Sequence, residues 1–465
     1  MTHRLSSSDE AEQTPPQELK RALTNRHIQL ISIGGAIGTG LFMGSGKTIS
    51  LAGPSILLVY AIIGAMLFFV MRALGELLLS NLDYNSFSDF SADLLGPWAG
   101  FFTGWTYWLC WIVTGMADVV SIIHYVHFWF PGLPAIISVL CSIGLLLSLN
   151  IAAVRLFGEL EFWFALIKII AIVALILVGI GMLGAGFTAP EGTRASVSYL
   201  WVGGVFPHGV EGFMAGFQIA VFAFVGIELV GTAAAETKDP ETVLPKAINA
   251  IPVRIILFYV ISLAIIMCIT PWWHIDPVSS PFVNVFSMLG LPAAASIINF
   301  VVLTSAASSA NSGLFSTSRM LYGMAKTGVA SQYFGRLSRL SIPSNGLLFS
   351  CVCLLLGSVV CLFSRSAMAA FTLATTISAV LFIFIWSIIL CSYLAYRYQH
   401  PERHARSRYR MPMGVAMSVL GLMGFAAIVY MLWLKDDTRQ ALLITPVWFV
   451  LLGIGYTLRR KHRSA

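Results

Sequence analysis

The chain has 465 residues, of which 57% are hydrophobic and only 11% are charged, and its mean hydropathy is +0.83. Because soluble domains carry about 25% charged residues, this composition excludes a soluble fold and indicates an integral membrane protein. The net charge of +7 does not imply a nucleic-acid partner, since the basic residues gather at the ends of apolar segments.

Twelve apolar stretches are close to the roughly 20 residues that an α-helix needs to cross a bilayer. The alternating pattern of a membrane β-barrel is missing, which leaves helices as the spanning elements. We therefore expect an all-α polytopic membrane protein with twelve transmembrane helices, at 28–48, 54–76, 97–128, 134–154, 160–184, 211–235, 253–271, 291–323, 347–364, 368–396, 413–433 and 441–458.

The distribution of basic residues predicts the orientation. With the N-terminus in the cytoplasm, 22 of the 28 Lys and Arg residues lie on the cytoplasmic side, five lie outside, and Lys168 lies within a helix. This asymmetry favours cytoplasmic N- and C-termini. Residues 1–27 show no signal-peptide pattern and are expected to be a cytoplasmic tail. The basic run YRYQHPERHARSRYR, residues 396–410, is interpreted as a solvated loop and not as a binding patch.

The first expected helix contains an unusual cluster of glycines, ISIGGAIGTGLFMGSGKT, at residues 31–48. Its ending resembles a nucleotide loop, but a P-loop needs glycine at Leu41 and the dinucleotide pattern needs it at Met43. Glycine costs about 1 kcal/mol in a helix interior. Two interpretations remain, close helix packing through small residues and an interrupted helix whose freed peptide groups face a charged substrate.

The sixth expected helix, GFQIAVFAFVGIELVG, supports an interruption. It places Gly226 near its middle and Glu228 two residues later. Transporters built from inverted repeats carry interrupted helices at matching positions of the two halves. The first and sixth expected helices are each the first helix of a five-helix unit, so they occupy matching positions.

Three stretches carry a family resemblance, namely GGAIGTGLF in the first helix, EFWFALIK in the fifth, and FAFVGIELVGTAAAETKDPE followed by LPKAI at the sixth. Together they resemble the amino acid permeases of the amino acid–polyamine–organocation superfamily, over nearly the whole chain from about residue 19. The resemblance implies a leucine-transporter-like fold with a 5+5 inverted repeat plus two helices. The corresponding ranges are 1–27 for the N-terminal tail, 28–184 and 185–396 for the two repeats, 397–458 for the last two helices and 459–465 for the C-terminal tail.

The resemblance also implies proton-coupled import of small zwitterionic amino acids across the inner membrane, with D-alanine, D-serine and glycine favoured. Another neutral amino acid, or an amino acid sensor on the same fold, is the alternative. The expected partners are the amino acid, protons and membrane lipid, with no cofactor and no metal, and the sequence leaves the oligomeric state open. Protons are favoured over sodium because Lys168 would repel a cation at the place where sodium-coupled relatives hold one.

Residue roles follow from the same resemblance. The substrate carboxylate would meet the break in the first helix, and the substrate ammonium would meet the break in the sixth, where Phe222 matches an aromatic gate. A further candidate, Ser378, lies in the tenth expected helix. The expected substrate-binding residues are Ala36, Gly38, Thr39, Gly40, Phe222, Ala223, Val225 and Ser378.

Buried charges are the candidates for proton coupling, because an ionisable group inside a membrane indicates function. Lys168 either takes this role or snorkels to the interface, about 12 Å from it at 1.5 Å per residue. Its possible partners Ser308 and Ser309 fit a plain polar helix interface equally well. Glu228 and Asp118 are interpreted as coupling residues or as structural hydrogen-bonding groups.

Other polar and aromatic residues have simpler interpretations. The Thr39 hydroxyl adds a donor to the site or bonds its own helix backbone. Arg72 and Glu76, four residues apart, are expected to pair. The aromatic residues of the third helix are expected to face lipid or the interface: Trp105, Tyr107, Trp108 and Trp111. An enzyme would need a convergent catalytic set, and a channel a charged ring or filter loop; neither pattern is visible.

Overall fold

The computed structural model describes residues 37–82, 84, 86–151, 154–190, 192–229, 239–290 and 292–464. In these ranges the regular elements are helices, apart from one isolated bridge between Thr188 and Arg194. Nine of the described helices are long and apolar enough to cross a membrane, and two shorter apolar helices accompany them. The prediction of an all-α, multi-pass membrane protein is confirmed.

The first predicted span is described from residue 37 onward. It contains α2 (Thr39–Phe42) and α3 (Gly44–Ala52), and a 3₁₀ turn, η1 (Gly53–Ser55), joins it directly to α4 (Ile56–Ser80). Gly53 adopts a φ of 58° at this junction, a conformation that favours glycine. Since residues 44–80 are counted as one of the nine candidate spans, two predicted spans share one of them. The count of twelve and the inverted repeat remain predictions.

The other predicted spans also correspond to helical segments. The first half continues with α5 (Phe87–Leu95), α6 (Pro97–His127), α7 (Ala135–Ile151) and α8 (Val154–Gly184). The sixth span contains α9 (Gly209–Ala220) and η3 (Phe222–Phe224), and the seventh contains α11 (Pro240–Asn249), α12 (Ile251–Ile255), the π-helix η4 (Ile256–Ile261) and α13 (Ser262–Ile269). The remaining helices are α14 (Pro281–Ser287), α15 (Pro292–Lys326), α16 (Ser344–Cys361), α17 (Ala367–Gln399), α18 (Pro401–Arg406), α19 (Gly414–Trp433) and α20 (Asp436–Ser464).

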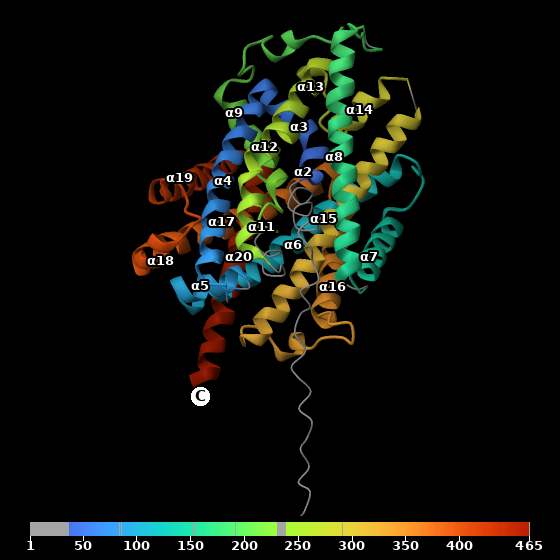
Figure 1. The fold of residues 1–465 in the computed structure, drawn as a ribbon. Helices are drawn as coiled ribbons and strands as arrows, with labels where there is room; N and C mark the ends of the chain where they lie inside the picture. The colour runs from blue at the N-terminus through green and yellow to red at the C-terminus, as the bar shows by residue number, and fades with distance from the viewer. Residues whose placement is uncertain are drawn as a thin grey trace, which may run out of the picture.

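Helix α6 lies at the centre of the bundle and packs against α15 and α17. Its most apolar membrane window is 78% buried within the protein, against 28% for α19 and 22% for α20, which lie at the periphery. Figure 1 shows α7 and α8 on one side of the bundle and α18 and α19 on the other. The short helices α2 and η3 contact each other inside this bundle.

The central position of α6 overturns the prediction for its aromatic residues. Tyr107, Trp108 and Trp111 are buried, with exposed fractions of 0%, 6% and 3%. Tyr107 and Trp111 pack edge-on against Phe382 of α17. Trp108 donates to Ser350 of α16 at 3.0 Å. These rings form the core between helices and do not face lipid; only Trp105 is half-exposed.

The expected Arg72–Glu76 pair is also wrong, because each residue binds the loop that precedes α19. The Glu76 carboxylate lies 2.5 Å from His404 Nδ1 and accepts from the Met411 backbone N–H at 2.7 Å. Arg72 donates to Asn249 Oδ1 at 2.9 Å and to the Arg410 carbonyl. The Arg72 guanidinium also lies 3.9 Å from the centre of the Tyr409 ring. This network fastens the 400–411 loop to α4 and α11.

Candidate functional site

The backbone is not helical just before α2, in the middle of the first predicted span. Gly38 is extended, with φ −125° and ψ −165°, and serves as the N-cap of α2. Its carbonyl accepts from the N–H groups of Leu41 and Phe42 at 3.2 and 3.3 Å. The first N–H groups of a helix have no acceptor within it, so the start of α2 presents donors inside the bundle. Ala36, a predicted site residue, lies outside the described residues.

A second interruption follows α9. The chain passes through the 3₁₀ turn η3, then Val225 becomes extended with a ψ of 135°, and Gly226 adopts a φ of 100°. Such a φ strongly favours glycine, which explains Gly226. The Gly226 N–H donates to Glu228 Oε2 at 3.2 Å, so Glu228 caps the interruption that it follows. The other oxygen, Oε1, is buried and has no hydrogen-bond partner among the described residues.

The two interruptions touch each other. A Cβ atom added at Gly40 would lie 2.5 Å from the Cα of Ala223 and 2.9 Å from the Phe222 ring. Glycine at position 40 is therefore required for close packing of α2 against η3. At Gly38 the nearest atom to such a Cβ is the Ser309 hydroxyl oxygen, at 3.9 Å. Gly38 and Ser309 are each only partly buried, so they border accessible space.

Most carbonyls of the second interruption already accept hydrogen bonds. The Phe222 carbonyl accepts from the Val225 N–H at 3.0 Å, and the Phe224 carbonyl accepts from the Ile227 N–H at 3.2 Å. The Ala223 carbonyl accepts from the Tyr259 hydroxyl at 2.8 Å. A carbonyl oxygen has two lone pairs, so a bound ammonium would share these carbonyls with the donors already present.

Asp118 joins α6 to the start of α2. The Thr39 hydroxyl donates to Asp118 Oδ1 at 2.8 Å, and both residues are buried. The alternative in which Thr39 bonds its own backbone is therefore not the one observed. Asp118 Oδ2 is buried and has no hydrogen-bond partner among the described residues. An orphaned buried oxygen of this kind is where a proton or a ligand would bind.

Lys168 lies in a separate polar cluster between α8 and α15. Its exposed fraction is 1%, and its ammonium donates to the Ser308 hydroxyl at 3.1 Å, so it does not snorkel to the interface. Ser308 in turn donates to Glu161 Oε2 at 2.7 Å. Asn311 donates to the other oxygen of Glu161 at 3.0 Å, and Asn150 of α7 donates to Asn311 at 2.7 Å. The chain of hydrogen bonds therefore connects three helices.

Glu161 belongs to this cluster but is not among the residues predicted from the sequence. It is 4% exposed and shares Ser308 with Lys168. The available signal was its spacing, because seven residues are two turns of a helix and place Glu161 and Lys168 on one face. The fifth helix was predicted to begin at 160, which put Glu161 at the interface, whereas α8 begins at Val154.

Residues 305–309 of α15 lie beside both the start of α2 and the Lys168 cluster. Ser305 donates to the Ile37 carbonyl at 3.2 Å, next to the interruption before α2. Ser308 contacts Lys168, while Ser309 faces Gly38. Of the two predicted serines, Ser308 therefore belongs to the Lys168 cluster and Ser309 lies beside the start of α2. Ser378 lies elsewhere, where its hydroxyl is 2.7 Å from that of Thr114 on α6.

Non-helical backbone segments that meet inside a helical membrane protein, beside buried ionisable groups, are typical of secondary transporters. The amino acid permease family model matches residues 27–465 of the chain. The D-serine/D-alanine/glycine transporter of Escherichia coli (strain K12) is 64% identical over 97% of this chain and 96% of that protein.

Two relatives from Bacillus subtilis (strain 168) also match over nearly their whole length. The amino-acid permease AapA is 53% identical over 96% of this chain and 97% of its own. The probable threonine/serine transporter YbxG is 39% identical over 95% of each chain. The chain belongs to the amino acid permease family. Amino acid transport, and a transporter in place of an enzyme, are thus confirmed at the level of the family.

Proposed function

We propose that this chain imports D-serine, D-alanine and glycine across the inner membrane together with protons, with both termini in the cytoplasm. The main support for the substrates is the 64% identity, over 97% of the chain, to the Escherichia coli transporter named for these three compounds. The proposed orientation is based on the excess of Lys and Arg on one side of the predicted spans. The proposed inner-membrane location is based on the similarity to bacterial permeases.

The proposed mode of binding uses the two interruptions. A zwitterion has a carboxylate and an ammonium a few ångströms apart, and removing either charge from water costs several kcal/mol. The free N–H groups at the start of α2, around Gly38, Thr39 and Gly40, would bind the carboxylate, because a helix N-terminus favours an anion. Carbonyls from Phe222 to Val225 would bind the ammonium, with Phe222 closing over the substrate.

Small substrates fit the crowding around these groups. The Phe222 ring packs edge-on against Phe371 of α17, with 6.1 Å between ring centres. Gly40 leaves no room for a methyl group beside Ala223. Glycine, alanine and serine have the smallest amino acid side chains, so we expect them to be accepted beside these packed residues.

Proton coupling is assigned to the two polar clusters. Asp118 lies against Thr39 at the carboxylate end of the proposed site, and its second oxygen is open to a proton. Lys168 and Glu161 share Ser308, so a proton gained or lost by either would change the hydrogen bonds of α15. The same helix contacts the start of the first interruption through Ser305. Movement of a proton would thereby be linked to the shape of the site.

A competition assay tests the substrate assignment. Uptake of labelled glycine into proteoliposomes is measured against unlabelled D-alanine, D-serine, glycine, L-alanine and L-proline. We expect the first three to compete best. The alternative is a permease for another neutral amino acid, which the 39% identity to a probable threonine/serine transporter favours; preferential competition by L-threonine, added to the same series, would support it. A sensor on the same fold would bind these compounds without uptake.

A further inference from the structure

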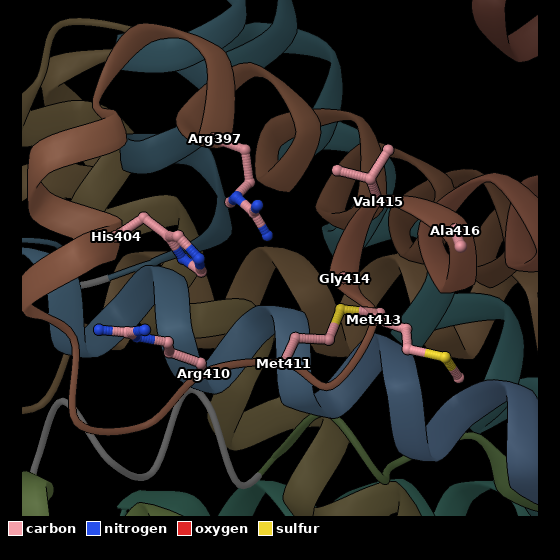
Figure 2. A pocket seen from close by; sticks show the side chains of 8 residues that line it. All are labelled: Arg397, His404, Arg410, Met411, Met413, Gly414, Val415 and Ala416. Carbon is pink, nitrogen blue, oxygen red and sulfur yellow. The ribbon is translucent and has the colours of Figure 1, made fainter.

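A cavity of about 430 Å³ lies between the end of α17, the helix α18 and the start of α19. Figure 2 shows Arg397 and His404 pointing into this space, with Met411 and Met413 below them and the first turn of α19 beside them. The cavity is lined by Arg397, His404, Arg410, Met411, Met413, Gly414, Val415 and Ala416. It therefore combines basic and apolar walls.

The arginine charge at the cavity, unlike that of His404, is not matched by a neighbouring acid. His404 faces the Glu76 carboxylate at 2.5 Å, so its charge is matched when it is protonated. Arg397 donates to the Tyr393 hydroxyl at 3.3 Å, and Arg410 donates to the carbonyls of Ser407 and Ala405. Those partners are uncharged. Within the described ranges neither arginine forms an ion pair. Figure 2 shows the Arg410 guanidinium turned away from the other lining side chains, so Arg397 supplies the unmatched positive charge inside the cavity.

The apolar wall of the cavity continues along the lipid-facing surface of α19. Val415, Val419 and Met423 follow each other at four-residue spacing on one helix face, with exposed fractions of 48%, 45% and 63%. Met413, at the mouth of the cavity, is 70% exposed. In a membrane such a face contacts acyl chains, so a molecule in this cavity meets Arg397 and His404 at one end and an apolar surface along the rest.

We propose that this cavity binds the phosphate headgroup of an anionic phospholipid of the cytoplasmic leaflet, with the acyl chains along α19. Arginine is suited to phosphate because its planar guanidinium can donate two parallel hydrogen bonds. Basic pockets between helices on the cytoplasmic side recognise such headgroups. The proposal rests on the cytoplasmic orientation inferred above. It revises the interpretation of residues 396–410, since Arg397, His404 and Arg410 of that run line a cavity.

The cavity is placed to act on the bundle. Its wall includes Met411, whose N–H binds Glu76, and Arg410, whose carbonyl binds Arg72. Glu76 and Arg72 both belong to α4. A lipid seated here would therefore hold the 400–411 loop against α4, which predicts that the lipid stabilises the folded protein.

Thermal unfolding of the full-length protein in an uncharged detergent tests the proposal. The probes are dioleoyl-phosphatidylglycerol, dioleoyl-phosphatidylcholine with the same acyl chains, and inorganic phosphate. We expect phosphatidylglycerol alone to raise the melting temperature strongly. Arg397→Gln should raise the concentration needed for half of this effect about five-fold, the loss expected for one basic residue at a membrane surface. Arg397→Lys keeps the charge but loses the paired hydrogen bonds of the guanidinium, so its response should lie between those of the unaltered protein and Arg397→Gln.

Arg408→Gln is the matched control, because Arg408 lies in the same loop, is exposed, and does not line the cavity. It removes the same charge and should leave the response unchanged. An equal loss in Arg408→Gln, or equal stabilisation by phosphatidylcholine, would overturn the proposal in favour of general attraction to lipid. Stabilisation by inorganic phosphate at similar concentration would assign the cavity to a soluble anion. If Arg397→Gln does not fold, Arg397→Lys is compared with Arg408→Lys in the same way, and a weaker response to phosphatidylglycerol at position 397 alone is expected. Lipid binding is read independently of uptake, so failure here leaves the proposed transport function intact.

Discussion

The hydroxyl of Tyr259 donates a 2.8 Å hydrogen bond to the carbonyl of Ala223, and so ties the seventh predicted span to the interruption in the sixth. The Tyr259 ring stacks on Phe224, with 4.6 Å between ring centres and 12° between planes. Tyr259 belongs to the π-helix η4. Since π-helical turns are rare and frequent at functional sites, we interpret Tyr259 as a positioning residue for the proposed ammonium end.

Removing this hydroxyl should weaken substrate binding without loss of the fold. Tyr259→Phe keeps the stacked ring and deletes a hydrogen bond with a net value of about 1 kcal/mol, so we expect KM for glycine uptake to rise about five-fold. Tyr60→Phe is the control, because the Tyr60 ring packs on the rings of Phe224 and Tyr259 and its hydroxyl has no partner among the described residues. Equal KM values for the two variants would remove Tyr259 from the site.

The contact between the two interruptions predicts different effects at two neighbouring glycines. Gly40→Ala forces a methyl group against the Ala223 backbone, and a displacement of about 1 Å in a binding geometry can cost on the order of a hundred-fold in rate. Gly38→Ala adds a methyl group where the nearest atom is 3.9 Å away and the backbone is extended. Uptake by the alanine variants, normalised to protein in the membrane, should therefore fall far more at position 40. Similar uptake by both would contradict the observed packing.

The Lys168 cluster should control coupling more than binding. Lys168→Met and Glu161→Gln each remove one charge from a pair that shares Ser308. We expect both variants to lose accumulation driven by a pH gradient while still exchanging labelled for unlabelled glycine. Proteoliposomes loaded with glycine measure the two activities separately. Accumulation at the normal level in Lys168→Met would reduce this residue to a structural role.

How far the sequence predicts this molecule depends on the kind of feature. Span positions follow from apolar length, because a bilayer imposes that length, and α15 and α17 begin and end within a few residues of the expected bounds. The break after α9 was signalled by glycine, and Gly226 does occupy a conformation that needs it. The glycines at 34 and 35 lie outside the described residues. These features depend on local sequence.

Features that depend on a partner helix were harder to predict. In a membrane both the lipid-facing and the core surfaces are apolar, so Trp108 and Trp111 gave no sign that α6 is central. The four-residue spacing of Arg72 and Glu76 shows only that they share a helix face. Their partners come instead from α11, from α18 and from the loop at 407–411. Likewise, no local pattern places Tyr259 beside Ala223.

The choice of driving ion can be tested without any variant. If Lys168 occupies the place of a sodium ion, uptake should follow an imposed inward proton gradient in sodium-free buffer. Abolishing that gradient with a protonophore should stop accumulation. The measurement is glycine uptake into proteoliposomes with sodium or choline as the only other cation. A strict requirement for sodium would contradict the proton assignment.

In the proposed function, the backbone breaks at α2 and η3 bind the two poles of one small zwitterion. The most direct test of this binding mode is competition for labelled glycine by molecules that lack one pole, glycinamide without the carboxylate and acetate without the ammonium, with unlabelled glycine as the reference. We expect that neither analogue competes at concentrations where glycine does, because the peptide groups at α2 and at η3 must both be engaged. Competition by either analogue at the level of glycine would contradict it.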